Sequence, residues 1–261
     1  MNYKFTLSYL GTRYHGWQRQ LNAVTIQATL EDTLSRLTGE KVHLIGCGRT
    51  DAGVHARNYV ANGMVNTSIP EEKLPLALNA NLPEDIVVHK AEIVPDDFHA
   101  TFSCVEKEYT YSIYNARTRD PFLCDRAAYI PGPLDFDKMV EAAKYFVGEH
   151  DFSSMRTLGS NVKTTVREIY YCELTKEGDL IRMRVAANGF LYNMVRTIAG
   201  TLVFVGLGKI KPEEITSILE SCDRKNAGPV LEACGLCMTG VKYLQNQRHH
   251  TSRKDGHRSS A

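Results

Sequence analysis

The sequence lacks any long uninterrupted apolar run, and this absence argues against a membrane-spanning protein. Its longest apolar stretch, residues 190–207, is interrupted by Asn193 and Arg196, so it predicts a buried amphipathic helix. The first six residues alternate like a strand and lack the apolar core of a secretory signal peptide. We therefore expect a cytoplasmic protein with no membrane attachment.

The sequence also lacks the repeated ligand pairs of a zinc site. Its seven cysteines are scattered and mostly lie in apolar segments, as in proteins of the reducing cytoplasm. Cys234 and Cys237 form the only C-x-x-C pattern, and no second pair stands at zinc-finger distance, so we predict two buried thiols and no structural metal. The glycines on either side of Cys47 do not have the spacing of a dinucleotide-binding motif.

Neither sign of charge is in excess, because Lys and Arg total 31 and Asp and Glu total 30, for a net charge of +1. This balance argues against a protein held to nucleic acid by bulk charge alone. The signs are nevertheless segregated along the chain. Basic residues outnumber acidic ones in four stretches, 1–30, 41–70, 152–167 and 180–211. We expect a local basic surface that suits a polyanionic partner if the fold brings these stretches together.

Hydrophobic periodicity predicts the same order of elements twice, strand-helix-strand-strand-helix-strand. The first half has expected strands at 3–9, 42–47, 59–65 and 86–94 and expected helices at 26–39 and 71–79. The second half has expected strands at 109–113, 166–174, 181–185 and 238–243 and expected helices at 135–147, 191–205 and, as an addition, 212–221.

This order predicts an α+β fold of two ferredoxin-like, or RRM-like, β-α-β-β-α-β halves joined by an antiparallel sheet. We place the N-terminal half at residues 1–103 and the C-terminal half at residues 104–245. Residues 246–261 are polar and aperiodic, and we predict a disordered tail there.

The densest group of reactive residue types lies at residues 46–57, where three glycines indicate a loop with tight turns. Asp51 is the only carboxylate between Lys41 and Pro70, and it has Arg49, His55 and Arg57 nearby in the sequence. These cations should favour its ionised form, which suits a nucleophile or an anionic base. The alternative is an ordinary Asp-x-Gly turn in which Arg49 pairs with Asp51 to hold the loop.

Two other segments offer residues for the same site. Tyr109 lies on an expected strand, where it either stacks on a base or packs within the sheet. Arg196 interrupts an apolar helix and needs a carboxylate, a phosphate or solvent, and pairing with Asp51 would satisfy both residues.

The segment at residues 11–20 combines aromatic residues, glycines and two arginines with no acid. It is a candidate RNA-binding loop, and the alternative is a glycine-rich hairpin whose tryptophan anchors it to the core. Its candidate contact residues are Arg13, Trp17, Gln18 and Arg19.

Taken together, these residues resemble the tRNA pseudouridine synthase I family. The stretch Gly-Arg-Thr-Asp-Ala-Gly-Val-His-Ala at 48–56 carries the resemblance most strongly. Further family motifs follow in order up to Tyr243, at 16–18, 25–27, 107–111, 150–154, 190–196, 198–202 and 205–206. The chain departs from the usual family pattern at Leu10, at Met155 and at 229–237.

The resemblance implies an isomerase that converts uridine to pseudouridine in the anticodon stem and loop of tRNA, at tRNA positions 38, 39 and 40. It implies an active-site cleft between the halves, no metal or organic cofactor, and a homodimer in which one tRNA contacts both subunits. By motif position Asp51 is the catalytic nucleophile, and Arg49, Tyr109 and Arg196 complete the catalytic group. The expected substrate-binding residues are Tyr109, Arg13, Trp17, Gln18, Arg19, His55 and Arg57.

Two other functions stay open from the residues alone. A non-catalytic RNA-binding protein built on paired ferredoxin-like halves would need the aromatic and basic residues but not Asp51. A metal-dependent nuclease or phosphatase would need several clustered acids, and Asp51 stands alone in its segment.

Overall fold

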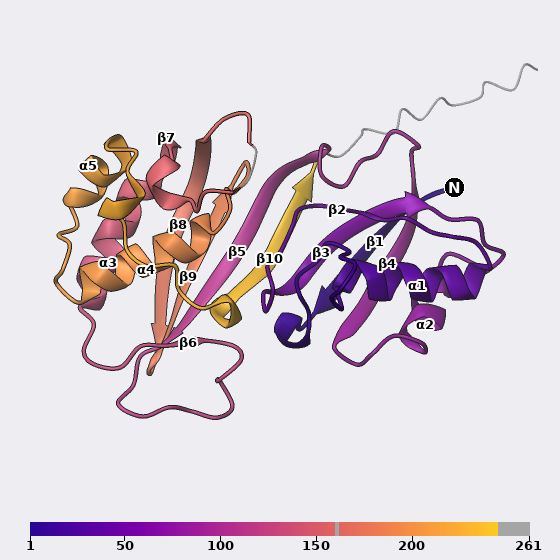
Figure 1. The fold of residues 1–261 in the computed structure, drawn as a ribbon, viewed down its shortest axis with the longest axis horizontal. Coiled ribbons are helices and arrows are strands. Elements are labelled where there is room, and N and C mark those ends of the chain that lie inside the picture. Colours follow the sequence, from indigo (N-terminus) through magenta and orange to yellow (C-terminus); the bar gives the residue numbers. More distant parts are fainter. Residues whose placement is uncertain (160–161, 245–261) are drawn as a thin grey trace, which may run out of the picture.

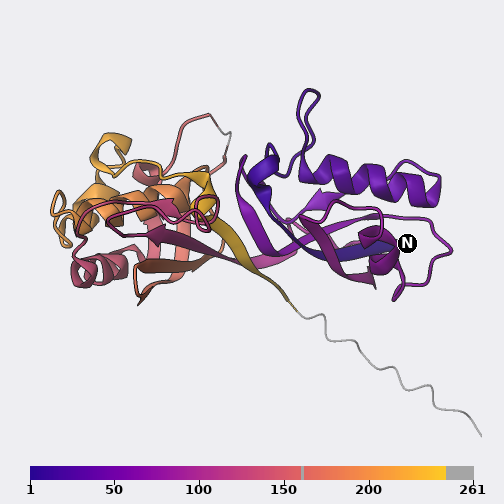
Figure 2. The same cartoon turned by 90° about the horizontal axis from the view of Figure 1, so that it is seen from below.

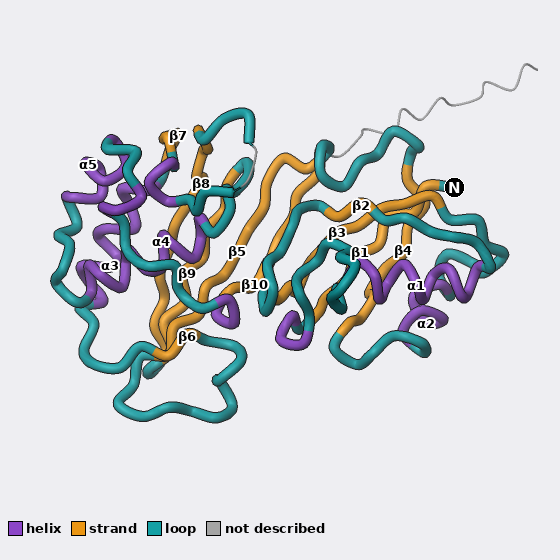
Figure 3. Tube along the Cα trace, viewed as in Figure 1, coloured by secondary structure: helices purple, strands orange, loops and turns teal. Residues whose placement is uncertain are grey.

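The computed structural model describes residues 1–159 and 162–244. The tail predicted at 246–261 lies outside the described residues. The strands form one 10-stranded sheet with the order β4-β1-β3-β10-β5-β9-β8-β7, and β2 and β6 are added at β3 and β5 (Figure 1). In Figure 3 the strands run as one layer through both halves of the molecule. No helix among these residues is long and apolar enough to cross a lipid bilayer.

The N-terminal half holds one end of the sheet. Its elements are β1 (Asn2–Tyr9), α1 (Ile26–Thr38), β2 (Ile45–Gly46), β3 (His55–Met64), α2 (Leu74–Asn79) and β4 (Ile86–Val94), with a 3-10 turn at Gly11–Arg13. Helix α1 begins where the Thr25 side chain accepts a hydrogen bond from the Ala28 amide, and it ends at Gly39, whose φ of 75° suits glycine.

The C-terminal half holds the other end of the sheet. Its elements are β5 (Cys104–Tyr114), β6 (Ala128–Tyr129), α3 (Phe136–Ala143), β7 (Gly148–Asp151), β8 (Val166–Glu177), β9 (Leu180–Ala187), α4 (Met194–Gly206), α5 (Glu214–Glu220) and β10 (Leu236–Tyr243). Short 3-10 turns lie at Lys144–Phe146, Ser153–Met155, Arg224–Asn226 and Ala233–Gly235.

Strand β10, the last in the sequence, lies between the two halves. It pairs antiparallel with β5 over its length and parallel with β3 through Cys237 opposite His55 and Met238 opposite Ala56. The sheet is therefore mostly antiparallel, as expected, but its pairing at the junction of the halves is parallel. Strand β10 therefore connects β3 of the N-terminal half with β5 of the C-terminal half.

Alternating burial shows that one face of the sheet carries the core. On β1 the side chains of Tyr3, Phe5 and Leu7 are buried, and on β5 Tyr109 and Tyr111 are buried. Because successive strand residues point to opposite faces, these side chains all point to the face that α1 and α4 cover (Figure 2). The other face of the junction carries polar side chains.

The segment expected as a strand at 42–47 forms only two residues of strand. Two of its amides bond to side chains of α1 instead of to a neighbouring strand: the Val42 amide donates to Ser35 Oγ (3.0 Å), and the Leu44 amide donates to Glu31 Oε1 (2.9 Å). The strand prediction was wrong there because apolar alternation does not show which acceptors a segment will meet.

Other element boundaries shifted by a few residues. Helix α4 starts at Met194 and not at 191, because Asn193 adopts a left-handed conformation with φ 60°. Helix α3 ends at Ala143 and continues as a 3-10 turn, and β5 begins at Cys104, before the alternating tyrosines. The short strands β6 and β7 had no periodic signal.

Candidate active site

The loop between Cys47 and Val54 presents Asp51, and the N-terminal segment at residues 14–17 fixes its backbone. The Trp17 amide donates to the Thr50 carbonyl (3.1 Å), and the Gly53 amide donates to the Tyr14 carbonyl (3.2 Å). Gly16 allows this close contact, because its φ is 82° and an added Cβ would lie 2.2 Å from the Thr50 carbonyl oxygen. The carboxylate therefore sits on a loop that is held on both sides.

Two tyrosines of the sheet form hydrogen bonds to the same loop. The hydroxyl of Tyr9, at the end of β1, is 2.9 Å from Thr50 Oγ1, and the Tyr59 hydroxyl of β3 donates to the Gly48 carbonyl. Both tyrosines are buried. The core of the N-terminal half thus extends to within one residue of Asp51.

Arg196 reaches Asp51 from the other half of the protein. Its Nη1 lies 3.6 Å from Asp51 Oδ2, and the side chains of Arg196 and Asp51 are 17% and 34% exposed. Arg196 is fixed by two further hydrogen bonds, from Nε to the Leu231 carbonyl (2.7 Å) and from Nη1 to Asn193 Oδ1 (2.9 Å). The pairing expected between the helix arginine and the loop aspartate is confirmed, and it joins the two halves.

Burial raises the pKa of Asp51 above its usual range, although the neighbouring Arg196 acts in the opposite direction. We had expected surrounding cations to favour the ionised form, and that expectation was wrong in sign. The reason is that the side chain loses solvent and gains a single cation at a moderate distance. A carboxylate in this state is a less stabilised anion, and therefore a better nucleophile, than one in a tight salt bridge.

Tyr109 of β5 completes the group from the C-terminal half. It is buried, and its ring meets Phe190 edge-to-face with the ring centroids 5.2 Å apart. Burial and the negative charge of Asp51 both raise the pKa of its hydroxyl, so the group stays protonated at neutral pH. Within the described residues this hydroxyl makes no hydrogen bond to another protein group, so it is free to donate to a substrate. Sequence reasoning missed Phe190 as its packing partner, although Phe190 opens the motif at 190–196.

Arg49 lies on the same loop as Asp51 but points elsewhere. Its side chain is exposed, and it forms no ion pair among residues 1–159 and 162–244. The alternative in which Arg49 holds the loop by pairing with Asp51 is therefore wrong, because Arg196 occupies that position. The exposed Arg49 guanidinium is therefore available to a ligand.

His55 and Arg57, both expected to bind substrate, do not join Asp51. His55 is buried: its Nδ1 accepts from the Gly11 amide (3.0 Å), and its Nε2 donates to the carbonyls of Asp125 (2.8 Å) and Cys234 (3.1 Å). Burial lowers its pKa, which favours the neutral ring that this pattern requires. His55 thus ties the loop to both halves.

The exposed Arg57 lines a cavity of about 520 Å³ at the junction of the halves. Thr110 and Ser112 of β5 also line it, whereas Asp51 does not. Because these two residues alternate with Tyr109 and Tyr111 along the strand, the cavity lies on the opposite face of the sheet from the site. Arg57 is thus separated from Asp51 by the sheet itself.

The four candidates of the N-terminal loop have different surroundings. Trp17 is buried against Tyr59, with the ring centroids 4.3 Å apart, which matches the alternative of an anchored hairpin. Arg13 pairs with Asp85 at 2.7 Å, and Arg19 pairs with Glu31 at 2.7 Å and Asp32 at 2.6 Å. Gln18 is exposed.

Possible metal ligands are not grouped in the part of the chain that the structure describes, where no three His, Cys, Asp or Glu side chains come close enough to hold an ion. Cys234 and Cys237 are partly buried free thiols, and burial raises the pKa of each to about 11.

Comparison with known proteins places this geometry in a family. A family model described as tRNA pseudouridine synthase matches residues 6–103 and 142–244. Relatives named tRNA pseudouridine synthase A include those of Caldicellulosiruptor bescii, 49% identical over 242 residues, and Clostridium acetobutylicum, 46% identical over 242 residues. Each alignment covers 93% of this chain and 99% of the relative.

Among solved structures, a chain in a crystal structure of a Cbf5-Nop10-Gar1 complex aligns with a TM-score of 0.39 and 17% identity. The alignment covers 91% of this chain and 49% of that chain, so this chain spans about half its length. The family model matches residues of both halves, including Arg49, Asp51 and Arg196, and the relatives align over 93% of this chain, which therefore belongs to the tRNA pseudouridine synthase family of isomerases.

Proposed function

We propose that the protein converts uridine to pseudouridine in the anticodon stem and loop of tRNA, at positions 38, 39 and 40, with Asp51 as the nucleophile. The observation that supports this most directly is the partly buried Asp51 carboxylate, faced by Arg196 from the other half at 3.6 Å. A non-catalytic RNA-binding protein would have no use for a desolvated carboxylate held in this way.

The reaction breaks the bond between N1 of uracil and C1′ of ribose, turns the base, and joins C5 to C1′. No atom is gained or lost, and no redox change occurs. An ionised carboxylate serves each chemical route: attack at C6 of the base, attack at C1′ of the ribose, or removal of a proton from C2′ to give a glycal. Arg196 is proposed to orient Asp51 in all three, and the protonated Tyr109 hydroxyl is proposed to relay a proton.

The target nucleotide has to leave its stack before it reaches Asp51, at a cost of a few kcal/mol. Stacking on an aromatic side chain returns about 1 to 3 kcal/mol, and Tyr109 is the residue proposed to receive the base. Arg49 is exposed, and it has no ion pair within the part of the chain that the structure describes; we propose that it fills the space that the base leaves.

The proposal extends to the assembly and its location. We propose a cytoplasmic homodimer in which one tRNA contacts both subunits, consistent with seven free cysteines and with a sheet face at the junction that no helix covers. Among the expected contact residues, we propose that the exposed Arg13, Gln18 and Arg57 contact tRNA directly. We propose that Arg19, which is bound to Glu31 and Asp32, and the buried Trp17 and His55 hold the surrounding segments in place. Light scattering of the protein alone and with tRNA tests the assembly.

Substitution of Asp51 tests the catalytic proposal. Asp51→Asn should bind unmodified tRNA with the wild-type dissociation constant and form no pseudouridine. The product is measured by chemical mapping of pseudouridine in the anticodon arm, and binding by filter retention. Turnover retained in this variant would remove Asp51 from the mechanism.

A further inference from the structure

A hairpin at residues 18–24 carries an exposed apolar tip. Gln20 and Ala23 form a bridge across it, Leu21 at the tip is fully exposed, and Val24 is 62% exposed. Figure 2 shows the hairpin standing out from the side of the sheet that carries α1 and α4, next to the boundary between the halves. An exposed leucine alone is common, but here it is held away from the body on a fixed support.

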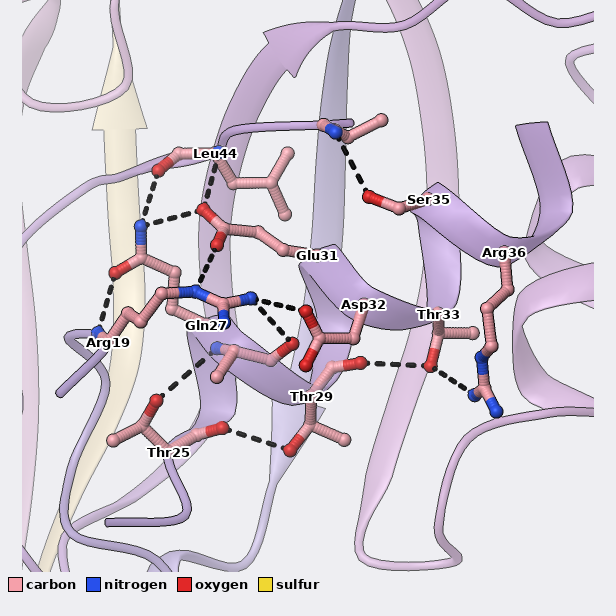
Figure 4. A network of polar contacts seen from close by, with 12 residues as sticks. Arg19, Thr25, Gln27, Thr29, Glu31, Asp32, Thr33, Ser35, Arg36 and Leu44 are labelled. Atoms are coloured by element: carbon pink, nitrogen blue, oxygen red, sulfur yellow. Dashed lines mark hydrogen bonds and ion pairs between the residues drawn. The ribbon is translucent and has the colours of Figure 1, made fainter. Parts of the chain in front are cut away.

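A polar network fixes the base of the hairpin to α1 (Figure 4). Arg19 pairs with Glu31 and Asp32, its Nη2 donates to the Ala28 carbonyl (3.2 Å), and its amide donates to Gln27 Oε1 (2.9 Å). Glu31 is 2% exposed, so this arginine is held at a buried charge. The Arg19 guanidinium is thus committed to the support of the hairpin.

The same support is continuous with the catalytic loop. The Trp17 amide donates to the Thr50 carbonyl, and the Gln27 amide donates to the Trp17 carbonyl (3.0 Å). A short hydrogen-bonded arm therefore joins the hairpin to Thr50, the residue that precedes Asp51. Because Asp51 faces Arg196 of α4, the site and the tip lie on the same side of the sheet, and a long ligand at Asp51 can extend toward the tip.

The chemistry of the tip favours contact with bases and ribose over contact with phosphate. No charged residue occurs between positions 20 and 30, so the tip cannot neutralise a phosphate. It offers an apolar side chain, Leu21, beside the amide of Asn22. Apolar side chains that enter a groove can open a base step, and amides bond to base edges.

We propose that Leu21 is a substrate-binding residue that contacts the nucleobases or riboses beside the target uridine and helps to open their stack. This inference rests on the proposed function, because it requires a structured RNA substrate at Asp51. The arm makes the contact at no cost in loop ordering, since its hydrogen bonds already fix it.

The test compares Leu21→Ala with Leu76→Ala, a control in which an equally apolar and 70% exposed side chain of α2 is removed. The substrate is an unmodified tRNA transcript. We expect Leu21→Ala to lower kcat/KM at least tenfold, with an unchanged melting temperature, and Leu76→Ala to match the wild type. The slope of log Kd against log salt concentration should be the same in all three proteins, because no phosphate contact is lost.

Three results would overturn the inference. The first is a kcat/KM of Leu21→Ala within twofold of the wild type. The second is a flatter salt slope, which would indicate an electrostatic contact. The third is a change of oligomeric state in light scattering, which would make Leu21 a contact between copies. If the wild-type protein forms no pseudouridine in this tRNA, the proposed function itself fails, and that result is distinct from the other three.

Discussion

Removal of the Arg196 charge should shift the pH dependence of the reaction. At the observed 3.6 Å and an effective dielectric constant of about 20, two unit charges attract by about 4.6 kcal/mol. The side chains are 17% and 34% exposed, and solvent screening at that exposure reduces the attraction between the two charges to about 2 kcal/mol. One pKa unit corresponds to about 1.4 kcal/mol.

Arg196→Met removes the cation that opposes the effect of burial on the Asp51 pKa. Because the proposed mechanism needs ionised Asp51, the rate should rise with pH as this group loses its proton. In the variant that rise should begin at higher pH, by about 1.5 pH units. The assay is single-turnover pseudouridine formation from about pH 5 to 9, which reports the enzyme–tRNA complex.

Two other variants complete this experiment. Arg196→Lys keeps a cation, so the acid limb of its pH–rate profile should shift less than that of Arg196→Met. Arg184→Met is the control. Arg184 pairs with Glu108 of β5 at 2.8 Å, and Glu108 points to the face of the sheet opposite Asp51, so this variant should keep the wild-type pH dependence. If the acid limb of the Arg196→Met profile stays at the wild-type pH, Arg196 is not the group that sets the charge state of Asp51.

Three further predictions concern stability. Because the folded-state pKa of Asp51 is raised, its ionised form costs stability above that pKa, and the cost disappears as the pH falls below the unfolded value of about 4. Asp51→Asn should therefore melt at a higher temperature than the wild type at pH 7. Calorimetry should show that this difference in melting temperature shrinks near pH 4. Gly16→Ala should lower both stability and kcat more than Gly39→Ala, because both glycines have positive φ but only at Gly16 would an added Cβ meet the Thr50 carbonyl. Equal losses of unfolding free energy in urea would contradict this close contact. Arg19→Met should cost about 1 to 3 kcal/mol in urea unfolding, because buried Glu31 loses its cation, whereas Asp32→Asn, at a 66% exposed carboxylate, should cost less than about 1 kcal/mol; a small loss in both would show that the network does not hold the hairpin.

Much of the fold followed from local patterns. The expected strand at 86–94 and the helix that begins at Ile26 match β4 and α1, because period-2 alternation and an N-cap with a closing glycine are local signals. The segment at 42–47 did not follow, since its amides bond to Ser35 and Glu31 of a helix. The position of β10 between the halves could not be read from the chain either, because strand order depends on pairing between distant segments.

The sequence by itself determined the composition of the catalytic loop, the isolation of Asp51 among basic residues, and the need of Arg196 for a partner. The tertiary structure decided which groups meet. It brought Arg196 to Asp51 from the other half, turned His55 and Arg57 away from the site, and paired Arg13 and Arg19 with acids of their own half. It also reversed the expected shift of the Asp51 pKa, because neighbours in sequence indicate nearby charges, whereas burial depends on how the two halves pack.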